Sequence, residues 1–170
     1  LDNNPVLGTK PDYEGLKKLK NVNTLVLDSL YAKKDGKTPS EKDAKEMLKD
    51  VLLGTDNKGK AIIVTTFSSH IARLKSIVDE GKKLKRKIVF LGRSLSKYIT
   101  AGEKVEIINF TKDAEMAKYK SQVKKLLNRI SPEKEKYVIV ATGHQGEPGS
   151  IMDTLVKDGF DFKLEKNDLV

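Results

Sequence analysis

Two hydrophobic patterns alternate along the 170-residue chain. Compact apolar runs are typical of buried strands, whereas apolar residues repeating every three or four positions are typical of amphipathic helices. The runs predict five buried strands, at 24–28, 61–65, 87–91, 105–108 and 137–141. The helical repeats predict helices at 11–20, 39–53, 70–78, 94–99, 113–130 and 150–157. Strands and helices therefore follow one another in turn from the first run to the last.

This alternation predicts an α/β fold. The strands read as continuous apolar runs, as expected when helices cover both faces of a sheet. We therefore expect a Rossmann-like open, mostly parallel sheet in a three-layer α/β/α arrangement. Three further details are predicted: a capping box at 38–41, a helix cap at Ser68 or Ser69, and a half-exposed strand at 160–165.

The predicted strand-to-helix junctions carry the residues with chemical potential. Right-handed crossovers place these junctions along one rim of a parallel sheet, where ligands bind. The turn at 141–150 is rich in glycine and small polar residues, a composition that presents backbone N–H groups to an anion such as phosphate. We expect a shared cleft there, formed by Asp28, Ser68, Ser69, His70, Arg93, Ser94, Gly143, His144, Gln145, Gly146 and Glu147.

Most of these residues also have a purely structural explanation. An acid such as Asp28 at a strand end can cap a turn, and serines at a helix start are ordinary caps. Arg93 could be a surface charge and His70 a packed or surface histidine, while Glu147 could offset a helix dipole. His144 has little packing to do between glycine and glutamine, so its position favours a functional role.

The charge favours a polyanionic partner. Lys and Arg number 33 against 24 Asp and Glu, a formal net charge of +9. A lysine-rich solubilising surface explains the same charge equally well. With two histidines and no cysteine, the chain cannot assemble a standard hydrolytic zinc site alone. It also lacks the P-loop and the Rossmann glycine fingerprint, and no apolar run approaches the roughly 20 residues of a membrane span.

Four segments resemble motifs of the β-CASP domains of ribonuclease J, in the expected order and with an archaeal-like form. Residues 28–32 (Asp-Ser-Leu-Tyr-Ala) resemble the first motif, and 66–73 (Thr-Phe-Ser-Ser-His-Ile-Ala-Arg) resemble the Phe-Ser/Ala-Ser segment. Residues 91–95 (Leu-Gly-Arg-Ser-Leu) and 142–148 (Thr-Gly-His-Gln-Gly-Glu-Pro) are similar to the later blocks. The resemblance extends over the whole chain. Leu30 departs from the Thr or Ser common at its position.

The resemblance implies the β-CASP part of a zinc-dependent, cytoplasmic 5′-to-3′ exoribonuclease that acts in RNA processing and decay. Residues 1–22 would join from a metallo-β-lactamase domain that holds two zinc ions, 23–165 would be the β-CASP domain, and 166–170 would start the return. The implied partners are single-stranded RNA, that lactamase domain and a second copy in a homodimer, with no membrane. We expect this chain alone to be inactive and to bind no catalytic metal.

The resemblance also implies roles for individual residues. Asp28 would be catalytic, pairing with a histidine of the lactamase domain. The other cleft residues would bind RNA phosphates, including the 5′-monophosphate, and the contact of His144 would weaken when its imidazole loses a proton. Three alternatives remain at this point: an endonuclease of the cleavage and polyadenylation type, the β-CASP part of an inactive, structural homologue as in some subunits of that machinery, and a stand-alone phosphate- or nucleotide-binding module.

Overall fold

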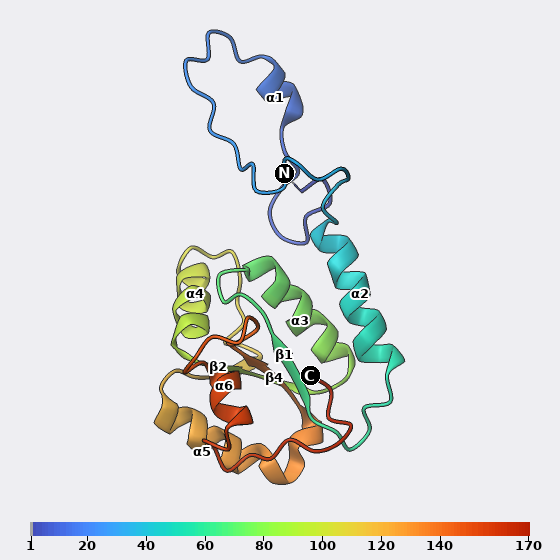
Figure 1. Cartoon of the computed structure of the whole chain (residues 1–170), viewed down its shortest axis with the longest axis vertical. Helices are drawn as coiled ribbons and strands as arrows, with labels where there is room; N and C mark the ends of the chain where they lie inside the picture. Colours follow the sequence, from blue (N-terminus) through green and yellow to red (C-terminus); the bar gives the residue numbers. More distant parts are fainter. Residues whose placement is uncertain (1) are drawn as a thin grey trace.

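The computed structural model describes residues 2–170 and shows an α/β body from which an N-terminal arm extends (Figure 1). The elements in chain order are α1 (Tyr13–Lys17), α2 (Glu41–Gly54), β1 (Ile62–Thr65), α3 (Ile71–Lys83), β2 (Lys87–Leu91), α4 (Arg93–Lys104), β3 (Ala114–Ala117), α5 (Lys120–Ile130), the 3-10 helix η1 (Ser131–Lys136), β4 (Tyr137–Ala141) and α6 (Ile151–Val156).

The sheet has four strands in the order β1-β4-β2-β3, and every pair is parallel. Ile63 and Val89 both lie opposite Ile139 of the central strand β4. The carboxyl ends of all four strands therefore lie at the same edge of the sheet, and the connection after each strand leaves from that edge. The open parallel sheet predicted from the sequence is confirmed.

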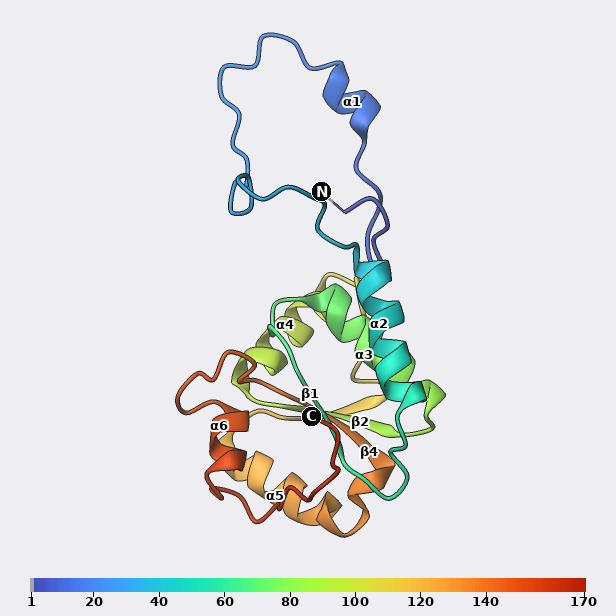
Figure 2. The same ribbon diagram turned by 45° about the vertical axis from the view of Figure 1, so that its right-hand side comes forward.

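Helices cover both faces of the sheet, because successive strand residues point to opposite sides. Phe90 and Val140 join one core with α2, α3 and α4, whereas Val89 and Ile139 join the other with α5 and α6. Figures 1 and 2 show the same division, with α3 and α4 on one side of the sheet and α5 and α6 on the other. The predicted three layers are therefore present.

The strand predicted at 24–28 is not formed. Leu25, Val26 and Leu27 are 73%, 89% and 70% exposed and lie in the arm, which projects from the start of α2 (Figure 2). A strand needs a neighbour to receive its backbone hydrogen bonds, and the arm has none among residues 2–170. The apolar run signals a need for burial but does not say against which surface.

The predictions between α4 and α5 are also wrong. Residues 105–108 form a turn instead of a strand, in which Glu106 has a left-handed φ of 59° that a strand does not accommodate. The strand lies further on, as β3, so the helix expected from 113 begins only at Lys120. β3 is a short edge strand that contains the polar Glu115, so its sequence lacks the continuous apolar run by which the other strands were predicted.

Three local predictions are corrected as well. The capping box of α2 joins Ser40 to Asp43 rather than spanning 38–41. His70, not a serine, is the N-cap residue of α3 and makes no capping side-chain bond. Residues 160–165 form no strand, although Phe160 and Phe162 are 5% and 1% exposed in the core beside α5. Their alternation reflects burial of an extended segment without ladder pairing.

Candidate functional site

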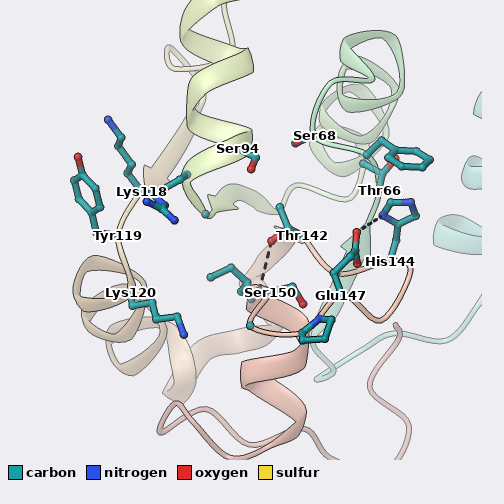
Figure 3. Close-up of a pocket in the computed structure, with 17 residues that line it drawn as sticks. Thr66, Ser68, Ser94, Lys118, Tyr119, Lys120, Thr142, His144, Glu147 and Ser150 are labelled. Atoms are coloured by element: carbon teal, nitrogen blue, oxygen red, sulfur yellow. Dashed lines mark hydrogen bonds and ion pairs between the residues drawn. The ribbon is translucent and has the colours of Figure 1, made fainter.

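The connections that follow all four strands meet around one cavity of about 580 Å³. It lies at the carboxyl ends of the strands, where an open parallel sheet places its ligand. Figure 3 shows side chains from these connections facing the same space. The lining comprises residues 66–68 after β1, 92–94 after β2, 118–120 after β3, and 142–144 and 147–151 after β4.

Two glycines allow the backbone to approach closely at this cavity. Gly143 has a φ of 120°, and a Cβ atom there would lie 2.5 Å from Ser150 Oγ. Gly92 has a φ of 118°, and its Cβ would lie 3.3 Å from Ile151 Cγ1. Any side chain would be strained at either position, and one at Gly143 would also push the turn away from α6. The turn and the start of α6 are therefore packed together as one wall.

Hydrogen bonds hold this wall in place. The Met152 N–H donates to the Thr142 carbonyl oxygen at 3.0 Å, and the Ile151 N–H donates to Thr142 Oγ1 at 3.4 Å. Ser150 caps α6 by accepting the Asp153 N–H at 3.1 Å. Thr142, the first residue after β4, is therefore held against the first turn of α6.

The start of α4 offers donors to an anion. Its N-cap residue is Gly92, which has no side chain and therefore provides no side-chain cap. The first N–H groups of a helix have no partner within the helix, and they carry the positive end of its dipole. With Arg93 and Ser94 directly after Gly92 in the cavity lining, this helix end suits a phosphate group.

Among the charged side chains that line the cavity, basic ones predominate. Arg93, Lys118 and Lys120 line it and are exposed, and none of the three has an ion-pair partner among residues 2–170. Lys118 Nζ lies 5.1 Å from the ring centroid of Tyr119. Within the described lining, Glu147 is the single acid. Unpaired cations around a polar cavity attract an anionic ligand.

His144 is held between an aromatic ring and a carboxylate. Its ring meets that of Phe67 edge to face, with centroids 4.0 Å apart. Nδ1 lies 3.8 Å from Glu147 Oε1, and the buried Nε2 has no hydrogen-bond partner within the described chain. Hydrogen bonds from its own N–H and from that of Gln145 lower the pKa of Glu147. Glu147 therefore stays ionised at neutral pH and faces the imidazole.

Six of the predicted site residues line this cavity: Ser68, Arg93, Ser94, Gly143, His144 and Glu147. Three others, Ser69, Gln145 and Gly146, are exposed in the same loops outside the lining. The loops after β1, β2 and β4 are therefore brought together as expected. The contribution of each residue to RNA binding stays a prediction.

His70 does not join this cavity. Its Nε2 lies 3.2 Å from Glu41 Oε1, and Arg73 makes a two-pronged contact with the same carboxylate, at 2.8 and 3.1 Å. His70 and Arg73 line a separate groove between α2 and β1. The expectation that His70 shares the cleft is wrong in this structure, because its place at the start of α3 turns it towards α2.

Asp28 also lies elsewhere. It is exposed in the arm, where its Oδ1 accepts the Leu30 N–H at 2.9 Å. Because no strand forms at 24–28, Asp28 is not placed on the rim of the sheet. The expected shared cleft therefore lacks this acid, and its catalytic role stays a prediction.

Sequence reasoning missed the contribution of β3. Lys118, Tyr119 and Lys120 follow this strand and line the cavity, as does the exposed Phe67 after β1. The basic-aromatic-basic triplet was visible in the sequence, but it was placed inside a predicted helix. Tyr119 and Phe67, each 51% exposed, offer faces on which a nucleobase can stack, which the low aromatic content did not suggest.

Zinc does not fit the residues of this chain. No group of three or more His, Cys, Asp or Glu side chains that could hold a metal occurs within residues 2–170. Catalytic zinc needs about three protein ligands around an open position.

No helix in the described part of the chain is long and apolar enough to cross a membrane.

Comparison with known proteins agrees with the geometry. The family model of the ribonuclease J β-CASP domain matches residues 59–170. Ribonuclease J of Methanocaldococcus jannaschii is 42% identical over 100% of this chain and 39% of its own length. Ribonuclease J of Pyrococcus abyssi is 38% identical over 89% of the chain and 34% of its own length. Ribonuclease J of Thermus thermophilus is 30% identical over 79% of this chain and 22% of its own length. The chain thus spans less than two fifths of the length of each of these three relatives.

Proposed function

The chain belongs to the family of ribonuclease J β-CASP domains, and from this premise we propose that it is the RNA-binding part of a 5′-to-3′ exoribonuclease. Its cavity at the strand ends would hold the 5′-monophosphate of single-stranded RNA. The observation that carries this proposal is the meeting of Arg93, the uncapped start of α4 and the Gly143 turn around one cavity.

These groups suit a terminal phosphate better than an internal one. A phosphate monoester carries a charge of about −1.5 to −2 at neutral pH, whereas a phosphodiester carries about −1. The guanidinium of Arg93 can donate two parallel hydrogen bonds to phosphate oxygens, and the N–H groups at the start of α4 can donate others. Lys118 and Lys120 add positive charge. The cavity would thereby favour RNA that ends in a 5′-monophosphate.

The cavity walls supply contacts for the nucleotide that carries this phosphate. Tyr119 and His144 lie at different sides of the cavity (Figure 3). Tyr119 is exposed, and Phe67 packs edge to face against His144. A base stacked on an aromatic ring gains about 1–3 kcal/mol without regard to its identity. Such contacts support binding of RNA of any sequence, as an enzyme of RNA processing and decay requires.

Cleavage, in this proposal, uses groups from outside this chain. As the family resemblance implies, two zinc ions would be held by a metallo-β-lactamase domain of the same protein; the described residues themselves offer no metal-ligand cluster. Zinc would supply an activated water there. Asp28 would contribute from the arm by holding a histidine of that domain. A homodimer and a cytoplasmic location complete the proposal.

Product analysis on the full-length natural protein tests this function. We expect release of mononucleotides from the 5′ end of a 5′-monophosphorylated RNA labelled along its length, and slower release from its 5′-hydroxyl twin. Internal fragments of similar yield from both RNAs would instead indicate an endonuclease of the cleavage and polyadenylation type. A protein that binds phosphate but cleaves neither RNA would be a phosphate-binding module.

A further inference from the structure

A second basic groove runs along α4 beside the cavity. It has a volume of about 630 Å³, and its basic residues are Arg93, Lys97, Lys104 and Lys118. No acidic residue is found in its lining within the described chain. Ser96 and Ala101 are also in the lining, so small residues leave room between the long cationic side chains.

The helical repeat places three of these cations on one face. At about 100° per residue, Arg93, Lys97 and Lys104 lie within a sector of about 40° around the axis of α4. The rise of about 1.5 Å per residue spreads them over about 16 Å. A line of cations with this length and direction can follow several successive phosphates of one strand.

The groove continues from the cavity. Arg93, Ser94 and Lys118 belong to the lining of both. Figure 3 shows Ser94 at the start of α4, with Lys118 beside that end of the helix. An RNA strand whose end lies in the cavity can therefore continue into the groove and meet a further row of cations there. None of the three residues shared by the two linings is acidic.

The cations of α3 and α4 differ in their partners. The basic residues of α3 are all paired with acids: Arg73 with Glu41, Lys75 with Asp79, Lys82 with Asp113 and Lys83 with Glu80. On α4 the basic residues Arg93, Lys97 and Lys104 have no such partner within residues 2–170. Its one acid, Glu103, instead accepts the N–H and the hydroxyl of Thr111, at 2.7 and 2.9 Å.

We propose that the α4 groove, defined by Arg93, Lys97, Thr100, Lys104 and Lys118, binds the phosphodiester backbone of the RNA strand beyond its 5′ end. This inference rests on the proposed function, because it takes the strand in the groove to be the one whose end lies in the cavity. The contacts are to phosphates, so the groove adds affinity for length and not for sequence.

A comparison of a short and a longer RNA distinguishes binding in the groove from binding in the cavity. We would measure binding of a 5′-monophosphorylated dinucleotide and of an RNA of about 12 nucleotides, a length within the range of single-strand binding sites. The full-length protein would be kept free of metal to prevent cleavage. The variants are Lys97→Ala/Lys104→Ala and Arg93→Ala. The matched control is Lys42→Ala/Lys125→Ala, which removes the same charge from exposed positions on α2 and α5.

The groove variant should bind the longer RNA about tenfold more weakly and the dinucleotide normally. Its log–log salt slope should fall by about 1.4, because each lost phosphate contact on a single strand removes about 0.7. The control should change neither. Equal loss for both lengths, or normal binding of the longer RNA, would overturn the groove. Arg93 belongs to both linings, so Arg93→Ala should weaken both RNAs. If it weakens only the longer RNA, the cavity proposal fails and the groove stands.

Discussion

The ring of Phe67 meets the imidazole of His144 edge to face, with 4.0 Å between the ring centroids. The two residues follow β1 and β4, which are neighbours in the sheet. Their contact therefore joins two of the loops that line the cavity. It also covers a histidine whose Nε2 is buried without a partner in the described chain.

This pair should be energetically coupled. We expect a double-mutant cycle of Phe67→Ala and His144→Ala to give a coupling of about 0.5–1.5 kcal/mol in the free energy of unfolding, the usual range for aromatic pairs. Urea titration of the four proteins measures it. Strictly additive effects would show that the contact does not stabilise the loops.

Gly143→Ala should disrupt the cavity wall. Alanine would be strained at a φ of 120°, and its Cβ would meet Ser150 Oγ, so we expect a loss of about 2–3 kcal/mol of stability and weaker RNA binding. Gly146→Ala is the matched control in the same turn. It has a φ of 72° with no atom within 4 Å of the added Cβ, so it should cost only about 1 kcal/mol. Equal losses would argue against the close packing of Gly143 on α6.

Asp168 should stabilise the fold in a pH-dependent way. Its side chain is 1% exposed, lies 2.8 Å from Lys134 Nζ, and accepts the N–H groups of Glu165 and Ala61. Burial acts to raise the pKa of Asp168, but these hydrogen bonds outweigh it and the pKa is lowered. The stabilisation is therefore present above the ordinary pKa of about 3.9 and is lost as the pH falls through the lower folded value.

Accordingly, Asp168→Asn should lower the free energy of unfolding by about 2–4 kcal/mol at neutral pH, and by less as the pH falls below about 4. Urea titrations of both proteins across this range test the trend. Glu165→Gln removes a 62% exposed partner of the same Lys134 and should cost no more than about 1 kcal/mol. A penalty for Asp168→Asn that is independent of pH would contradict the ionic account.

Asp28→Asn should lower turnover of the full-length enzyme with little change in RNA affinity. Asp28 is exposed in the arm and is not in the lining of the cavity, so we do not expect binding to depend on it directly. The expected loss is about 100-fold or more in kcat if the acid orients a proton-transferring histidine. Single-turnover cleavage and a binding titration separate the two effects. Unchanged turnover would remove Asp28 from catalysis.

Three of the four strands were predictable because their continuous apolar sequences leave a plain signal. The runs at 61–65, 87–91 and 137–141 are largely buried, and each corresponds to a strand. The edge strand β3 was not, because Ala114–Ala117 is short and includes a polar residue. The run at 24–28 carries a stronger apolar pattern but finds no partner strand in the described chain. Local pattern thus reports a need for burial, whereas pairing depends on distant residues.

The same reasons decide how much of the site was predictable. Arg93 and Gly143 follow well-predicted strands, and the parallel topology brings them to one rim. Lys118 was missed with the strand that precedes it. His70 was misplaced because its partner, Glu41, lies on α2 and approaches only through packing of α2 against α3. Residues placed by topology could be predicted, while those placed by side-chain packing could not.

The central claim is that the cavity recognises a 5′-monophosphate, and Arg93→Ala tests it most directly. The measurement is the affinity of the full-length, metal-free protein and of this variant for one RNA with a 5′-monophosphate or a 5′-hydroxyl end. We predict a loss of about tenfold or more for the phosphorylated RNA, since charge-assisted hydrogen bonds contribute about 1.5–3 kcal/mol, and a much smaller loss for the hydroxyl RNA. Equal losses for the two RNAs would contradict the account, because Arg93 would then not contact the terminal phosphate.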